Sequence, residues 1–150
     1  MAKTMEIRGH GGRIKIDVQG YERPDTSDGD DANWLAAQCS VEVGEFSCML
    51  NLSLVTRDFA GFLMQLEKAV DSLNGTAAFT TLEEGLHIEV RFNHAGHADL
   101  FGRARSQTSL VPEQSMLSFS FETDQSFLAQ TVRDLHGIVT QFPIRRPSAR

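Results

Sequence analysis

The sequence predicts an α+β domain in which a largely antiparallel sheet of about seven to eight strands is covered on one face by two helices. Two stretches of the chain carry this prediction. Each changes from apolar residues at every second position to apolar residues at helical spacing. The first stretch begins at Phe46 and reaches Leu73, and the second begins at Leu117 and reaches Phe142. A strand that leads directly into a helix accounts for both patterns.

The two predicted helices match each other at a constant offset along the chain. Phe59 corresponds to Leu128 and Leu66 to Leu135, whereas the strands before the helices align only after a shift of one residue. An internal β-α duplication is one interpretation of this match.

Alternation of apolar and polar residues locates the remaining strands. We expect strands at 4–8, 13–19, 33–43 and 45–55 before the first helix, and at 77–82, 86–93, 98–105 and 115–122 after it. Short polar turns join most neighbours and favour antiparallel pairing, and a single apolar face per strand is typical of a sheet covered on one side. Thr56 is the expected N-cap of the first helix, and Thr123 or Asp124 that of the second.

The length of 150 residues suits one α+β domain at 1–143, followed by a basic tail at 144–150 that we expect to be disordered past its first residues. No apolar run approaches the ~20 residues that span a bilayer. The first residues lack the core of a signal peptide, so we expect a cytoplasmic protein. The net charge of −6 argues against non-specific binding of nucleic acid. It favours a basic partner, although solubility alone also accounts for it.

The two cysteines, Cys39 and Cys48, fall on strands that a turn at Val43-Gly44 is expected to join. Such a turn places the two thiols opposite each other on the apolar face. A cross-strand disulfide there is strained, and a reducing cytosol disfavours it. We therefore expect buried free thiols.

Candidate metal ligands and catalytic groups are sparse. His94, His97 and Asp99 have the side chains to ligate a metal, but they lie at a hairpin turn, where polar residues are expected in any case. Phosphate-binding glycine-rich loops and serine-nucleophile motifs are missing from the sequence. The sequence therefore predicts no cofactor, no metal and no enzymatic activity.

The longest polar stretch inside the domain follows residue 20 and carries four aspartates around Gly29, namely Asp25, Asp28, Asp30 and Asp31. Their spacing does not fit the twelve-residue calcium loop. A solvated acidic loop and a loop that faces a partner are the two remaining interpretations.

The polar side of the later strands carries a basic and aromatic set, namely Arg91, Phe101, Arg103 and Arg105. A deep pocket lined by Arg91, Phe101 and Arg103 would indicate a protein that binds a small ligand on the polar sheet face, which is the alternative function. Glu89 and Asp99 dilute the positive charge, so cross-strand ion pairing is the simpler interpretation.

Several segments form a recognisable series: 21–24, 30–35 and 43–46 in the first half of the chain, and 121–128 and 142–145 in the second. Asp-Ala-Asn-Trp-Leu and Thr-Asp-Gln-Ser are their more distinctive parts. Together, over residues 13–145, they resemble a family of small bacterial proteins labelled WapI-type immunity proteins. The resemblance implies a cytoplasmic, non-catalytic protein that binds and neutralises a cognate toxin domain. The acidic balance is compatible with a basic toxin.

Partner-binding residues are expected in and beside the acidic loop, namely Tyr21, Asp28, Asp30, Asp31 and Trp34. Trp34 with Tyr21 would supply an aromatic anchor next to the carboxylates. Lateral packing of Trp34 at the end of the sheet is an equally good interpretation. A homodimer formed through the polar sheet face or a sheet edge is a further alternative.

Overall fold

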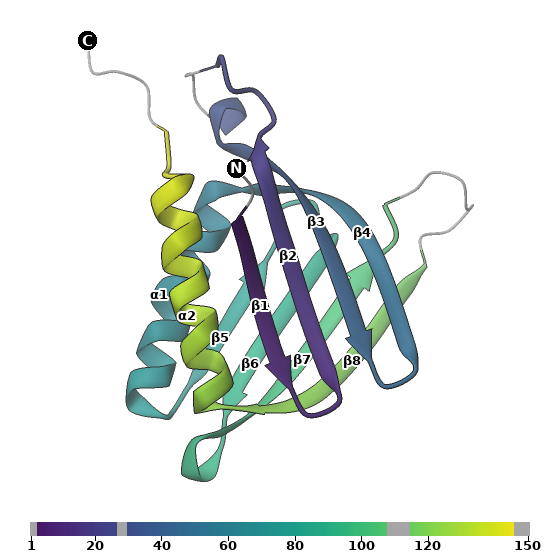
Figure 1. Cartoon of the computed structure of the whole chain (residues 1–150), viewed down its shortest axis with the longest axis vertical. Coiled ribbons are helices and arrows are strands. Elements are labelled where there is room, and N and C mark those ends of the chain that lie inside the picture. The colour runs from purple at the N-terminus through teal and green to yellow at the C-terminus, as the bar shows by residue number, and fades with distance from the viewer. Residues whose placement is uncertain (1–2, 27–29, 108–114, 146–150) are drawn as a thin grey trace.

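The computed structural model describes residues 3–26, 30–107 and 115–145 of the chain. Within them, four strands and a helix are followed by four more strands and a second helix (Figure 1). The first half consists of β1 (Lys3–Gly9), β2 (Gly12–Tyr21), β3 (Trp34–Val43), β4 (Phe46–Val55) and α1 (Thr56–Ser72). The second half consists of β5 (Thr76–Thr80), β6 (Leu86–Phe92), β7 (His97–Arg105), β8 (Met116–Asp124) and α2 (Gln125–Gln141). The predicted repeat is thus present in the order of the elements.

The strands form two antiparallel sheets of four strands each, in the orders β1-β2-β3-β4 and β5-β6-β7-β8. The α+β class, the antiparallel pairing and the two helices are confirmed, but the strands do not form one continuous sheet. The two sheets lie one over the other, and α1 and α2 run side by side along one flank (Figure 1). Alternation shows that each strand has one buried face. It does not show that the two buried faces cover each other while the helices close the side.

The inner faces of both sheets and the apolar sides of both helices form one core. Glycine permits a close approach between the sheets at Gly12. A Cβ atom on this residue would lie 2.2 Å from the ring of Phe121 on β8. Gly102 and Phe119 repeat the arrangement within the second sheet, where a Cβ atom would also lie 2.2 Å from the ring. Large rings therefore fill the space that the small residues leave.

The turn between β3 and β4 corrects the predicted alignment of the two cysteines. Gly44 and Glu45 form the turn, so Val43 pairs with Phe46 and Cys39 faces Leu50 rather than Cys48. Both thiols are free; Cys39 is buried, and Cys48 is partly buried. The expected turn position was one residue too early, which moved the predicted pairing by two residues.

Both helices begin with a carboxylate cap, but at different positions. In α2, Asp124 Oδ1 accepts from the backbone N–H of Phe127 at 3.1 Å, which confirms Asp124 rather than Thr123 as the N-cap. In α1 the expected cap Thr56 is wrong, because Val55 holds the N-cap position. Asp58 Oδ2 accepts from the backbone N–H of Val55 at 3.2 Å. Neither helix is long and apolar enough to cross a membrane.

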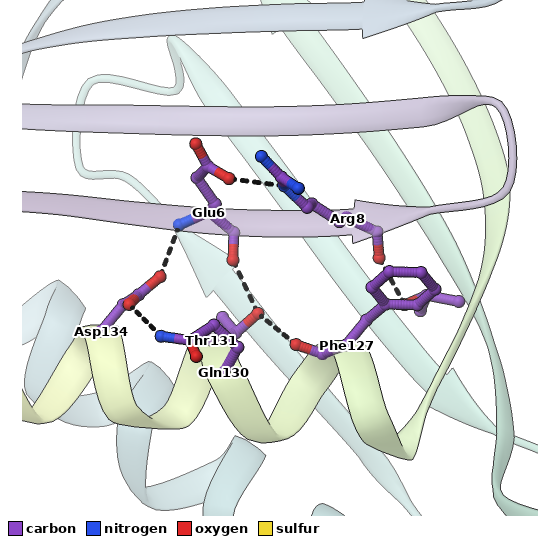
Figure 2. Close-up of polar contacts among 7 residues, drawn as sticks. Glu6, Arg8, Phe127, Gln130, Thr131 and Asp134 are labelled. Carbon is purple, nitrogen blue, oxygen red and sulfur yellow. Dashed lines mark hydrogen bonds and ion pairs between the residues drawn. The ribbon is translucent and has the colours of Figure 1, made fainter.

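The helices also cover one edge of each sheet, where unpaired backbone groups would otherwise meet water. Figure 2 shows how α2 lies along β1: Thr131 Oγ1 donates to the carbonyl oxygen of Glu6 at 2.7 Å, and Asp134 Oδ2 accepts from the N–H of Glu6 at 3.1 Å. On the other side, α1 lies along β5, and Gln65 Oε1 accepts from the N–H of Ala78 at 3.0 Å.

Candidate protein-binding site

The acidic loop that follows β2 is held in place by the segment that leaves α2. Arg145 is the centre of this contact. Its guanidinium lies 3.9 Å from the centroid of the Tyr21 ring. It donates to the carbonyl oxygens of Arg23 at 2.9 Å, Pro24 at 3.0 Å and Ala32 at 2.9 Å. An arginine with fixed fork geometry suits several acceptors at once, so one side chain fastens both ends of the loop.

Asn33, the last residue of the loop before β3, completes the attachment. Its buried side chain donates to the carbonyl oxygen of Arg145 at 2.9 Å and accepts from the N–H of Arg145 at 2.7 Å. The hydroxyl of Thr56, at the start of α1, also donates to the Asn33 side-chain oxygen at 3.1 Å. The residue expected to cap α1 therefore serves to anchor the loop. Ile144 and Arg145 are the only residues of the expected tail that the structure describes.

Tyr21 belongs to the same attachment. Its hydroxyl donates to the carbonyl oxygen of Pro143 at 2.6 Å, and its ring meets Phe142 edge-on at 5.7 Å between centroids. Burial raises the pKa of the Tyr21 hydroxyl, and the charge of Arg145 opposes this effect in part. The hydroxyl therefore keeps its proton near neutral pH and remains a donor.

A surface hollow of about 320 Å³ lies beside the loop. It is lined by Glu22, Arg23, Asp31, Trp34, Ser53 and Glu83. Arg23 pairs with Asp31 at 3.0 Å, and Ser53 Oγ donates to Glu22 at 2.7 Å. Glu83 comes from the turn between β5 and β6, so the hollow draws on both sheets. The result is an indole bordered by three carboxylates and one paired arginine.

The structure brings together only some of the residues predicted for partner binding. Trp34 and Asp31 line the hollow, whereas Tyr21 is half-buried beneath Arg145. Asp28 and the side chain of Asp30 lie outside the described residues; the backbone of Asp30 begins a short 3-10 helix, Asp30–Asn33.

Sequence reasoning did not place Glu22, Arg23, Ser53 or Glu83 at the partner-binding site, and it missed the role of Arg145. Glu22 was visible in the acidic run: residues 22–31 contain five carboxylates and one arginine. Glu83 and Arg145 gave no such signal, because they are distant in the chain from the loop that they approach.

On the polar face of the second sheet, within the described part of the chain, the residues expected to line a small-ligand pocket fall into two groups. The guanidinium of Arg91 lies 5.3 Å from the ring centroid of Phe101 and pairs with Glu89 at 3.1 Å. Arg103 instead borders a separate hollow of about 210 Å³ near His87. Cation–π contact and ion pairing thus occupy two of the three expected lining residues.

The metal and thiol candidates form no reactive cluster among the residues that the structure describes. No group of three His, Cys, Asp or Glu side chains converges in that part of the chain. The side chain of His94 lies outside it. Burial raises the pKa of the Cys39 thiol to about 12 and also raises that of Cys48. Both thiols are therefore poor nucleophiles near neutral pH.

Comparison with known proteins gives one match. A family model described as the immunity protein WapI-like family matches residues 5–143. The curated proteins and the solved structures give no match. The family match covers nearly the whole chain, including both helices, the acidic loop and the hollow, and it confirms the resemblance found in the sequence. The chain belongs to the WapI-like immunity protein family.

Proposed function

We propose that the chain neutralises a basic toxin domain in the cytoplasm by binding it, without catalysis, through the hollow around Trp34. The proposal rests on the membership of an immunity protein family. The single observation that carries the choice of surface is the indole of Trp34 bordered by Glu22, Asp31 and Glu83. Aromatic side chains next to charges that match the partner are typical of the centre of a protein interface.

Electrostatics favour a basic partner at this end of the molecule. The chain carries a net charge of −6, and five carboxylates fall within residues 22–31. Arg145 adds one positive charge beside the loop, but its hydrogen bonds to the described residues go to the carbonyl oxygens of Arg23, Pro24 and Ala32 rather than to carboxylates. An acidic surface of this kind accelerates association with a basic protein, and salt screens the attraction.

The attachment of the loop supports the same choice. Hydrogen bonds from Arg145 hold the described ends of the loop, at Arg23, Pro24 and Ala32, before any partner arrives. A surface that is already ordered loses less conformational entropy on binding. Tyr21 serves the proposed site indirectly, because it supports Arg145 rather than offering its ring to a partner.

The test requires a candidate toxin domain from the gene neighbourhood of this chain, made inactive so that it can be purified. We expect a complex that withstands size-exclusion chromatography and weakens as salt is raised. Trp34→Ala should weaken binding in calorimetry by ~30-fold, the equivalent of losing about 2 kcal/mol at an aromatic hot spot. The double variant Asp31→Asn, Glu83→Gln should mainly slow association and flatten the salt dependence.

Asp71→Asn is the control for losing a negative charge elsewhere on the surface, because this exposed residue lies near the end of α1, away from the hollow. It should leave the affinity unchanged. No binding of the toxin domain, together with no protection of cells that express it, would refute the proposed function. Binding that is insensitive to Trp34→Ala and to the double variant would refute the proposed surface.

A further inference from the structure

The outer edge of β4 is the least protected edge among the described strands. Phe46 is 68% exposed and Met49 is 64% exposed, and the strand carries no charged residue from end to end. Charged side chains, bulges or covering elements usually protect an edge strand from pairing with another chain. No described strand or helix pairs with this edge over residues 46–51.

The edges at β1 and β5 are contacted by helices, and the edge at β8 carries two carboxylates and is bound at one end. Side chains of α2 bind both backbone groups of Glu6 on β1, and Gln65 of α1 binds the N–H of Ala78 on β5. The end of β8 is tied to the first sheet, because the carbonyl oxygen of Glu122 accepts from the N–H of His10 at 2.8 Å. The contrast makes β4 the edge on which a further strand can be added.

The register identifies the backbone groups that are free to pair. Val43 and Phe46 flank a two-residue turn, and such a flanking pair exchanges both of its hydrogen bonds. Cys48 and Leu50 follow at every second residue and point their backbone groups toward β3. The backbone groups of Ser47, Met49 and Asn51 therefore point away from the sheet.

We propose that this edge pairs antiparallel with β4 of a second copy, joining two first sheets into one continuous sheet. Charge favours a second copy over a basic toxin. Two chains of net charge −6 repel each other, and the uncharged β4 adds nothing to that repulsion, whereas a basic partner is attracted more strongly to the three carboxylates around Trp34. Glu22 binds Ser53 near the far end of the strand, so the overlap is confined to residues 46–51.

Sedimentation and backbone hydrogen exchange test the proposal on the wild-type chain. Sedimentation between about 5 and about 500 µM should show a reversible monomer–dimer equilibrium, since a short strand pair binds weakly. The amide protons of Met49 and its outward-facing neighbours should exchange at least ~5-fold more slowly at the high concentration. The amides of Cys48 and Leu50, which bond to β3, should exchange at the same rate at both concentrations.

Two variants separate the edge from general surface hydrophobicity. Met49→Glu places a charge on the pairing edge and should shift the equilibrium to monomer. Met64→Glu adds the same charge to a methionine that is 70% exposed on α1, and it should leave the dimer intact. A monomer at every concentration would overturn the proposal. So would a dimer that Met49→Glu does not weaken, or exchange protection of these amides by the toxin domain instead of by a second copy.

Discussion

The first strand of each half is a sheet edge that the helix of the other half covers, and the two contacts differ in chemistry. At the junction of α2 and β1, Thr131 and Asp134 hydrogen-bond to the backbone of Glu6. At the junction of α1 and β5, the rings of Phe59 and Phe62 pack on Phe79 at 5.3 and 5.5 Å between centroids. One junction is therefore polar and the other aromatic.

Residues at equivalent positions of α1 and α2 show where the two contacts differ. Gln65 and Asp134 correspond under the offset that relates the two helices, and each accepts a hydrogen bond from an edge N–H. Phe62 and Thr131 correspond under the same offset, yet one is an aromatic ring and the other a hydroxyl donor. The two helices thus share a hydrogen-bond acceptor for an edge N–H group and differ in the other residues that contact the edge. Strand length explains part of the difference in polarity. The edge strand β1 has seven residues and β5 has five, and a longer edge has more backbone groups that need hydrogen-bond partners.

The aromatic junction should show the largest effect. Phe79→Ala removes a fully buried ring that both Phe59 and Phe62 contact, and it should lower the free energy of unfolding by ~3–5 kcal/mol. Urea denaturation followed by circular dichroism measures this loss. Phe101→Ala, on the exposed face of the same sheet, is the control and should cost under ~1 kcal/mol. Equal losses in the two variants would show that α1 does not depend on the aromatic contact.

Substitutions at the polar junction of α2 and β1 should cost less unfolding free energy, and the loss should depend on a single hydroxyl group. Thr131→Val keeps the shape of the side chain and leaves the carbonyl oxygen of Glu6 without its donor, which should cost ~1–3 kcal/mol. Thr131→Ser retains the hydroxyl and should recover most of this loss. Thr76→Val, at an exposed threonine on β5, serves as the control for β-branched substitution. A loss with Thr131→Ser as large as with Thr131→Val would mean that packing, not the hydrogen bond, holds α2 on β1.

The shared acceptor position predicts paired changes at single amides. Gln65→Ala should speed hydrogen exchange at the N–H of Ala78, and Asp134→Ala should speed exchange at the N–H of Glu6. Each should cost ~0.5–1.5 kcal/mol in unfolding free energy, the net value of one hydrogen bond. Each variant is the control for the other amide. Acceleration at both amides in either variant would instead indicate general loosening of the helix pair.

Much of this architecture was predictable because it depends on local patterns. The alternation along β4 and the helical spacing that begins near Phe59 indicated a strand followed by a helix, and the constant offset between the two helical patterns indicated the repeat. The sequence did not show whether a helix or a second sheet packs on the apolar face of each strand. A buried face has the same sequence pattern under a helix as under a second sheet.

The candidate site was predictable only where it is local. Asp31 and Trp34 lie in a short run that marks an acidic loop next to an aromatic residue. Glu83 and Arg145 reach the same place from other parts of the fold, and periodicity carries no information on such distant pairs. The predicted pairing of Cys48 with Cys39 was wrong for a more local reason. A glycine at position 44 can take either place in a two-residue turn, and each choice gives a different strand register.

The smallest expected effect concerns the first turns of the two helices. Asp124 is the N-cap residue of α2, whereas Asp58 lies three residues after the N-cap residue of α1. Burial raises the pKa of Asp58, and its hydrogen bond from Val55 opposes this only in part. The protonated carboxyl thus suits the fold better than the charged one. The contribution of Asp58 to stability is full at pH values below its unfolded pKa, and it is lost as the pH rises through its raised folded pKa.

Asp58→Asn removes this titration while keeping an acceptor for the N–H of Val55. The unfolding free energy of the variant, measured against wild type by urea denaturation from about pH 3 to about pH 7, should therefore improve relative to wild type as the pH rises and then level off. The opposite slope would mean that the charged carboxylate stabilises α1. A negative charge in the first turn of α1 would then be favourable, as the helix dipole alone predicts.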